Sequence, residues 1–112
     1  MNIQIYSKKK CFDTKKAERY FKERNIKYQL IDLLKYGLSK GEFDGVKTAV
    51  GLENLIDPAS PAYTALNLDK IRTKGVIEEL AQKNPQLYRT PIVRNGKKAT
   101  VGYQPDVWKT WE

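Results

Sequence analysis

The pattern of hydrophobic and polar positions in the first third of the chain predicts a strand, a helix and a second strand. Residues 2–7 alternate isoleucine with polar side chains, which is the period of a half-buried strand. Over residues 14–25 the hydrophobic positions recur on one face at helical spacing, and Asp13 or Thr14 can cap the first turn. Residues 28–33 predict the next strand. The order strand–helix–strand favours a right-handed parallel crossover.

The middle of the chain, residues 39–84, is predicted to be mostly helical. Ser39-Lys40-Gly41-Glu42 is a capping box, in which the hydroxyl and the carboxylate each bond a free backbone N–H group. The helix that it opens is expected to end at Gly51. Ser60-Pro61 starts a short helix, because proline is favoured at the first helical position. A further helix is predicted over residues 76–83.

The last third of the chain predicts a hairpin and a closing helix. Residues 91–93 and 99–103 have the composition of strands and flank Asn95-Gly96, which favours a type I′ turn with positive φ at both central residues. A final helix is predicted from Gln104-Pro105 onward. The side chains expected to point inward from it are Val107, Trp108 and Trp111.

These elements predict an α/β fold of the thioredoxin-like kind. A parallel βαβ unit is followed by a helical insertion over about residues 39–84 and then by an antiparallel ββα unit. With 112 residues the chain is long enough for one core and too short for two. We therefore expect a single thioredoxin-like domain over residues 1–112.

Composition narrows the chemistry further. The chain has one cysteine and no histidine, which excludes imidazole bases, zinc–histidine sites and a disulfide framework within the chain, so no metal site is expected. The formal charge of +8 comes from basic residues spread along the chain and mixed with acids, and no nucleic-acid-binding motif is present. No segment has the roughly 20 apolar residues of a membrane span, and no export signal begins the sequence. We expect a cytoplasmic protein with a solvated basic surface.

The lone thiol lies where the chain passes from the first strand to the first helix. A helix N-terminus offers unpaired N–H groups and a partial positive charge, and both stabilise a thiolate. Four lysines lie close to Cys11 in the sequence and add positive potential, namely Lys8, Lys9, Lys10 and Lys15, while Asp13 opposes them. Cys11 is thus a candidate nucleophile with a lowered pKa. The alternative is that Cys11 is an inert, buried small side chain.

The segment Cys11-Phe12-Asp13-Thr14-Lys15-Lys16-Ala17 resembles the active-site loop of the arsenate reductase (ArsC)/Spx family. In that family the cysteine is followed four residues later by a basic residue and six residues later by a small one. The likeness continues in order along the chain, through Gly51-Leu52-Glu53-Asn54-Leu55-Ile56, Ser60-Pro61-Ala62-Tyr63, Leu66, Asn84-Pro85-Gln86-Leu87, Arg89-Thr90-Pro91-Ile92-Val93, Val101-Gly102-Tyr103 and Trp108. The resemblance implies a thioredoxin-like fold with a helical insertion.

The resemblance also implies roles for single residues. Pro91 would be a cis-proline beside the thiol, so that Thr90 and Pro91 dock the backbone of a partner thiol. Arg89, with Lys10 and Lys15, would contact a substrate anion. The isomer of the Thr90–Pro91 bond is open at this stage, because most X–Pro bonds are trans.

Three positions depart from the family pattern. Thr14 stands where the redox-switching members have a second cysteine, so no local disulfide can form. Thr90 stands where the family usually has arginine, and Ala59 stands where arsenate-reducing members tend to have a basic residue. Because guanidinium groups bind oxyanions in a bidentate manner, these losses argue against arsenate itself as a substrate.

Three functions are compatible with these observations. The first is a monothiol, glutathione-type thiol oxidoreductase resembling arsenate reductase, with no bound cofactor and with glutathione or a glutaredoxin-like thiol donor completing the cycle. The second is an Spx-like transcriptional regulator that contacts the C-terminal domain of the RNA polymerase α subunit near Gly51, without a two-cysteine redox switch. Since Gly51 also suits a helix end that needs positive φ, that residue has a purely structural explanation too. The third is a scaffold that keeps the fold without the activity.

Overall fold

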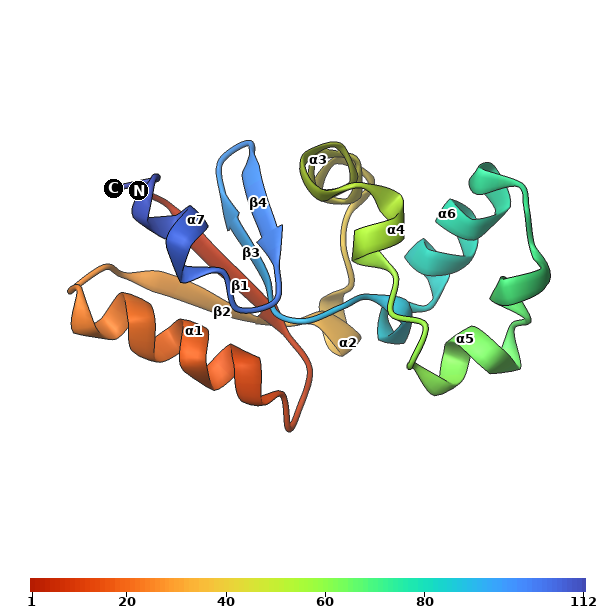
Figure 1. The fold of residues 1–112 in the computed structure, drawn as a ribbon, viewed down its shortest axis with the longest axis horizontal. Coiled ribbons are helices and arrows are strands. Elements are labelled where there is room, and N and C mark those ends of the chain that lie inside the picture. The colour runs from red at the N-terminus through yellow and green to blue at the C-terminus, as the bar shows by residue number, and fades with distance from the viewer.

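The computed structural model describes residues 1–112 and contains one four-stranded sheet with helices on both faces (Figure 1). The strands are β1 (Ile3–Ser7), β2 (Tyr28–Asp32), β3 (Ile92–Asn95) and β4 (Lys98–Val101), in the spatial order β2-β1-β3-β4. β1 and β2 are parallel, and the other two pairs are antiparallel. This is the βαβ plus ββα arrangement of the thioredoxin-like fold, as the sequence predicts.

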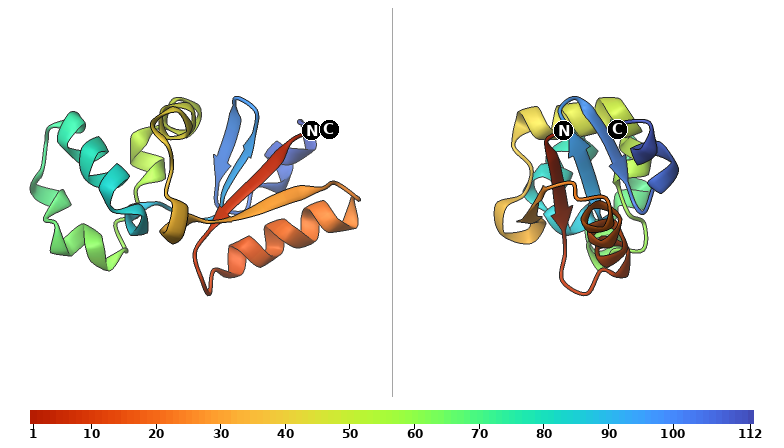
Figure 2. Two further views of the ribbon diagram at one scale, coloured as in Figure 1. Left: turned by 180° about the vertical axis from the view of Figure 1, so that it is seen from behind. Right: turned by 90° about the vertical axis from the view of Figure 1, so that its left-hand side faces the viewer.

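The helices fall into two groups along the chain. α1 (Phe12–Glu23) connects β1 to β2, and α7 (Pro105–Lys109) follows β4. Between β2 and β3 lie α2 (Leu33–Tyr36), α3 (Lys40–Val50), α4 (Leu52–Leu55), α5 (Pro61–Ala65), the 3₁₀-helix η1 (Leu68–Lys70), α6 (Lys74–Lys83) and the 3₁₀-helix η2 (Pro85–Leu87). This helical insertion extends from one end of the sheet and gives the molecule its elongated shape of 43 × 26 × 23 Å (Figure 2).

The alternation of side chains along β1 divides the core between the two faces of the sheet. Ile3 and Ile5 point to the face covered by α1 and α7, where they pack with Phe21 and Trp108. Tyr6 points to the other face and packs with the insertion, including Phe43 of α3. Both hydrophobic clusters are therefore built on the same sheet, and the insertion packs directly against it.

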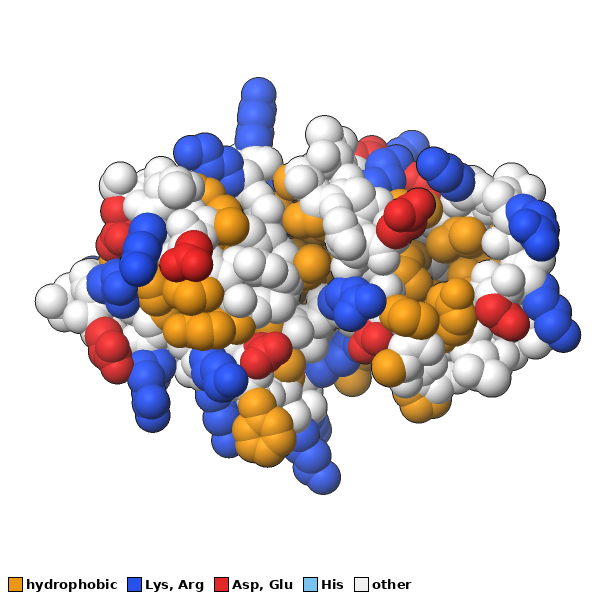
Figure 3. Space-filling view, viewed as in Figure 1, with side chains coloured by type: hydrophobic (Ala, Val, Ile, Leu, Met, Phe, Trp, Pro, Cys, Tyr) orange, Lys and Arg blue, Asp and Glu red, His pale blue; other side chains and the backbone are white.

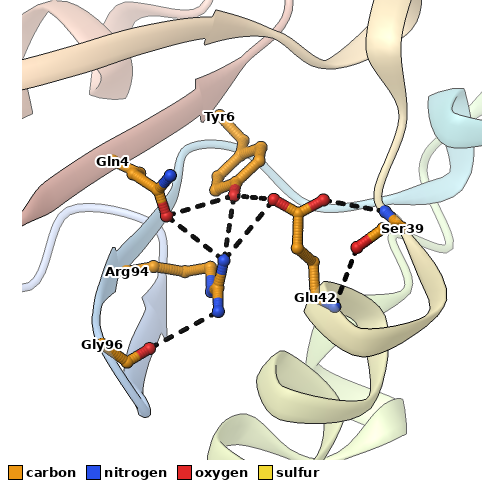
Figure 4. A network of polar contacts seen from close by, with 6 residues as sticks. All are labelled: Gln4, Tyr6, Ser39, Glu42, Arg94 and Gly96. Atoms are coloured by element: carbon orange, nitrogen blue, oxygen red, sulfur yellow. Dashed lines mark hydrogen bonds and ion pairs between the residues drawn. The ribbon is translucent and has the colours of Figure 1, made fainter.

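A polar network joins the sheet to helix α3 of the insertion (Figure 4). The buried hydroxyl of Tyr6 donates to the carboxylate of Glu42, and Arg94 Nη1 lies 3.1 Å from the Tyr6 hydroxyl and 3.5 Å from Glu42 Oε2. Glu42 also closes the capping box by accepting from the backbone N–H of Ser39 at 2.8 Å. One carboxylate thus caps α3 and fixes this helix to β1 and β3.

Local sequence signals place most of the elements. The capping box at Ser39, the end of α3 at Gly51 (φ 86°) and the proline at the start of α5 are all present. α6 begins at Lys74, two residues before the helix predicted over 76–83. No helix in the structure is both long and apolar enough to cross a bilayer.

Three local predictions are wrong. α1 begins at Phe12, so the residue at its N-cap position is Cys11 instead of Asp13 or Thr14. Asn95 is the last residue of β3 and pairs with Lys98, so the turn is Gly96-Lys97. In that turn only Gly96 has positive φ (61°), as a type II′ turn requires. Val107 is 39% exposed, because α7 turns only Trp108 fully into the core.

Candidate functional site

Cys11 occupies the N-cap position of α1. β1 ends at Ser7, and the chain turns through Lys10, whose φ of 62° is left-handed, before the helix begins. Cys11 itself is extended (φ −92°, ψ 109°) and half-buried. This placement directs the sulfur toward the free N–H groups of the first helical turn, which belong to residues such as Asp13 and Thr14.

A second loop brings Thr90 to the sulfur. The Thr90 hydroxyl donates to Cys11 Sγ at 3.3 Å. The Thr90–Pro91 peptide bond is cis, and Pro91 is buried at the start of β3. The loop is held on the side of the insertion by a hydrogen bond from Arg89 N to Leu55 O (2.8 Å) and on the side of the hairpin by one from Gly102 N to Pro91 O (2.8 Å). The position of Thr90 is therefore set by both halves of the molecule.

Thr14 lies one helical turn from Cys11 and completes the surroundings of the sulfur. Its side chain is only 6% exposed, and its hydroxyl has no partner with full hydrogen-bond geometry. Burial raises the pKa of the Cys11 thiol, but the hydroxyls of Thr14 and Thr90 and the backbone N–H groups of Thr14 and Asp13 lower it by more. The net effect is a Cys11 pKa below that of an ordinary thiol, so the thiolate is favoured.

Hydrogen-bond donors lower this pKa more than the lysines singled out from the sequence. Lys10 and Lys15 are exposed at the start of α1. Lys8, another of the four lysines near Cys11 in the sequence, is half-buried, and its ammonium donates to Gln86 O at 2.7 Å. Burial lowers the pKa of Lys8, while the charges of Asp57 and Cys11 act in the opposite direction, which shows that Lys8 lies within electrostatic reach of the sulfur.

Cys11 opens into a groove of about 860 Å³ between the hairpin and the insertion. Arg89 and Thr90 line this groove, together with the end of β4 and the end of α3. Lys10, Lys15 and Pro91 are not among the lining residues, and the anion-binding role expected for the two lysines stays a prediction. Two acids, Asp13 and Asp57, also line the groove. The groove thus offers a thiolate, one guanidinium group and two carboxylates.

Gly51 lies outside this groove. It is exposed at the junction of α3 and α4, and its φ of 86° suits glycine, which explains its presence structurally. Gly51 lines a second hollow within the insertion. No group of three or more histidine, cysteine, aspartate or glutamate side chains is arranged to hold a metal ion.

Comparison with known proteins assigns the chain to a family. The sequence pattern of the ArsC family matches residues 6–111. The chain belongs to the ArsC family. The global transcriptional regulator Spx 2 of Oceanobacillus iheyensis is 30% identical over 110 residues, which cover 95% of this chain and 80% of that protein. The global transcriptional regulator Spx of Listeria innocua is 31% identical over 108 residues, which cover 93% of this chain and 82% of that protein.

Solved structures confirm the ArsC-like fold. A putative ArsC family related protein from Bacteroides fragilis superposes with a TM-score of 0.86 at 20% identity, over 100% of this chain and 98% of that one. A putative arsenate reductase from Yersinia pestis superposes with a TM-score of 0.83 at 22% identity, over 97% of this chain and 99% of that one. The family and the fold are therefore established, while the choice between thiol chemistry and regulation depends on the site.

Proposed function

We propose that this ArsC-family protein is a monothiol thiol oxidoreductase that uses glutathione or an equivalent thiol as co-substrate. The observation that carries the proposal is the environment of Cys11, where two hydroxyl groups and two backbone N–H groups favour the thiolate over the thiol. The thiolate is the reactive form in thiol–disulfide exchange. An inert structural cysteine would instead be sealed among apolar side chains, whereas Cys11 opens into a groove.

The chain has a single cysteine, which determines the order of steps. The Cys11 thiolate attacks the glutathione sulfur of a mixed disulfide between glutathione and a substrate thiol. The substrate–glutathione S–S bond breaks, a Cys11–glutathione disulfide forms, and the substrate leaves as a thiolate that takes a proton from water. A second glutathione thiolate then attacks the bound glutathione sulfur and releases Cys11 as a thiolate with oxidised glutathione. The substrate is reduced, and two glutathione molecules become one disulfide.

The groove does not favour arsenate as the substrate. Arg89 is its only guanidinium group, Thr90 takes the place of a second one, and Ala59 is not among the lining residues. The carboxylates of Asp13 and Asp57 face the same space and would repel an oxyanion. The attack on a glutathione mixed disulfide has no such need for paired cations, because the attacked sulfur is uncharged. We therefore expect glutathione-dependent arsenate reduction to be weak or absent.

Two measurements test the oxidoreductase function. The rate of Cys11 alkylation by iodoacetamide, followed against pH, should rise to its plateau at a lower pH than that of a free thiol. Incubation with oxidised glutathione should give a stable adduct of one glutathione per chain, and Cys11→Ser should give none. A midpoint of the alkylation rate at or above about pH 8.5, the ordinary thiol pKa, would refute the proposal.

A second candidate function is regulatory. The relatives at 30–31% identity are named transcriptional regulators, and exposed Gly51 lies on a hollow that is separate from the thiol. On this alternative the chain binds the C-terminal domain of the RNA polymerase α subunit at the surface around Gly51. The interaction should survive Cys11→Ser and be lost in Gly51→Arg. Failure of the purified α-subunit domain to bind the wild-type chain would eliminate this alternative.

A further inference from the structure

The insertion contains a second hollow, which the thiol chemistry does not use. This hollow, the insertion pocket, has a volume of about 530 Å³ and lies between α4, α5, η1 and the start of α6. Its size is within the range of about 300–1,000 Å³ that is typical of small-molecule sites. In Figure 3 hydrophobic side chains gather over this part of the insertion, with charged side chains around them.

The inner surface of the insertion pocket is apolar. Ile56 and Leu68 are 6% and 3% exposed, so they form a closed hydrophobic floor. The half-buried side chains of Leu52, Tyr63 and Ile77 also line the space. A ligand for this surface needs an apolar body, because a fully polar molecule would lose its hydration here without gaining partners.

The edge of the insertion pocket is cationic. Arg72, Lys74 and Arg89 line it, against a single acid, Glu53. None of these three cations forms an ion pair in the structure, although seven ion pairs are present elsewhere in the chain. Lys74 is also the first residue of α6, whose N-terminus has no side-chain cap. Unpaired guanidinium and ammonium groups beside an apolar floor suit a ligand with one carboxylate at the end of a hydrocarbon chain.

We propose that the insertion pocket binds a small amphipathic carboxylate, with its chain on Ile56 and Leu68 and its carboxylate at Arg72 and Lys74. This inference goes beyond the proposed thiol chemistry, since Cys11 is not part of the pocket. The pocket nevertheless borders the Cys11 groove, because Arg89 lines both. Glu53 disfavours ligands with two negative charges, since a second anionic group would meet its carboxylate.

Binding is measured on the full ¹⁵N-labelled chain by NMR, with octanoate as the probe and octan-1-ol as its neutral counterpart. Octanoate should give saturable shift changes at the amides of Gly51, Leu52 and Ile77. Octan-1-ol should bind at least about tenfold more weakly, because it lacks the charge that the cations recognise. Equal binding of the two probes would overturn the proposal. Absence of saturable shifts with octanoate, as expected of a surface that serves only a protein partner, would overturn it as well.

Two pairs of substitutions locate the carboxylate. The double variant Arg72→Ala/Lys74→Ala should weaken octanoate binding at least about tenfold. The control double variant Lys97→Ala/Lys98→Ala removes the same charge from the exposed hairpin and should bind like the wild type. Equal losses in the two variants would overturn the proposal, since only net charge would then matter. Cys11→Ser should bind octanoate normally, so failure of the thiol chemistry and failure of this proposal are separate results.

Discussion

The hydroxyl of Thr90 lies 3.3 Å from the sulfur of Cys11 and donates a hydrogen bond to it. The two residues are 79 positions apart in the sequence, and each comes from a loop beside the central strands β1 and β3. Where the family usually has arginine, this chain therefore supports its thiolate with a neutral donor. The thiolate gains stability, but the site gains no positive charge with which to hold an oxyanion.

Removal of the Thr90 hydroxyl should make Cys11 less reactive at neutral pH. A neutral hydrogen bond contributes about 0.5–1.5 kcal/mol. At pH values below the pKa of Cys11, Thr90→Val should therefore lower the alkylation rate by about two- to tenfold. It should also move the pH profile of alkylation to higher pH, with the same plateau rate. Thr90→Ser keeps the donor and should resemble the wild type. If Thr90→Val and Thr90→Ser behave alike, the hydroxyl has no part in stabilising the thiolate.

Replacement of Thr14 by cysteine should change the mechanism. The Thr14 side chain is buried beside the sulfur, so a thiol at this position can reach Cys11. Thr14→Cys should therefore resolve the Cys11–glutathione disulfide within the chain, and mass spectrometry should show an oxidised protein without glutathione. Thr14→Ser is the matched control and should keep the adduct. Persistence of the adduct in Thr14→Cys would mean that the two sulfurs cannot meet.

The sequence predicts the structure best where a signal is local. The capping box of Ser39 and Glu42 and the glycine at position 51 define both ends of α3 because the groups involved are within a few residues of one another. Local signals also predict that Cys11 lies beside a helix N-terminus. That Cys11 itself occupies the N-cap position is not predicted, since Asp13 and Thr14 are stronger caps by residue type.

Contacts between distant segments decide which of the nearby lysines reaches the sulfur and where the hairpin turns. The charge of Lys8 reaches Cys11 because the residue after β1 stays half-buried near η2, whereas Lys10 turns into solvent. The hairpin turn begins one residue later than predicted because Asn95 pairs with Lys98 in the sheet. Strand register of this kind is decided by packing across the sheet, which the Asn-Gly dipeptide alone cannot reveal.

Arg89 should influence anionic reagents more than neutral ones. Its guanidinium lines the Cys11 groove, so it should attract iodoacetate to the thiolate but leave iodoacetamide unaffected. Arg89→Ala should lower the ratio of the iodoacetate rate to the iodoacetamide rate by about two- to fivefold at low ionic strength. Lys15→Ala removes an exposed charge outside the groove and should change the ratio less. A larger change in Lys15→Ala would instead support the anion-binding role that the family resemblance gives to that lysine.

The Tyr6–Glu42–Arg94 network should make stability depend on pH at both extremes (Figure 4). Burial and the hydrogen bond to Glu42 raise the pKa of Tyr6 from 10.0 to about 12. Since folding favours the neutral phenol, this contribution to the free energy of unfolding is complete below about pH 10 and is lost as the pH rises toward 12. For Glu42, burial raises the pKa, but hydrogen bonds from Tyr6 and Ser39 and the charge of Arg94 lower it by more. Its contribution is therefore present above the ordinary carboxyl pKa of 4.5 and is lost as the pH falls below that value.

Two variants separate these contributions. Tyr6→Phe should lower the free energy of unfolding at pH 7 by about 1–3 kcal/mol, because Glu42 and Arg94 lose a buried partner. It should also reduce the loss of stability between about pH 10 and 12, while the raised pKa values of Tyr20, Tyr28 and Tyr88 maintain the rest of that loss. Glu42→Gln should instead abolish the loss at acid pH, since the amide does not titrate. Urea unfolding at a series of pH values measures both effects. If Tyr6→Phe loses as much stability between about pH 10 and 12 as the wild type does, the titration of Tyr6 is not coupled to folding.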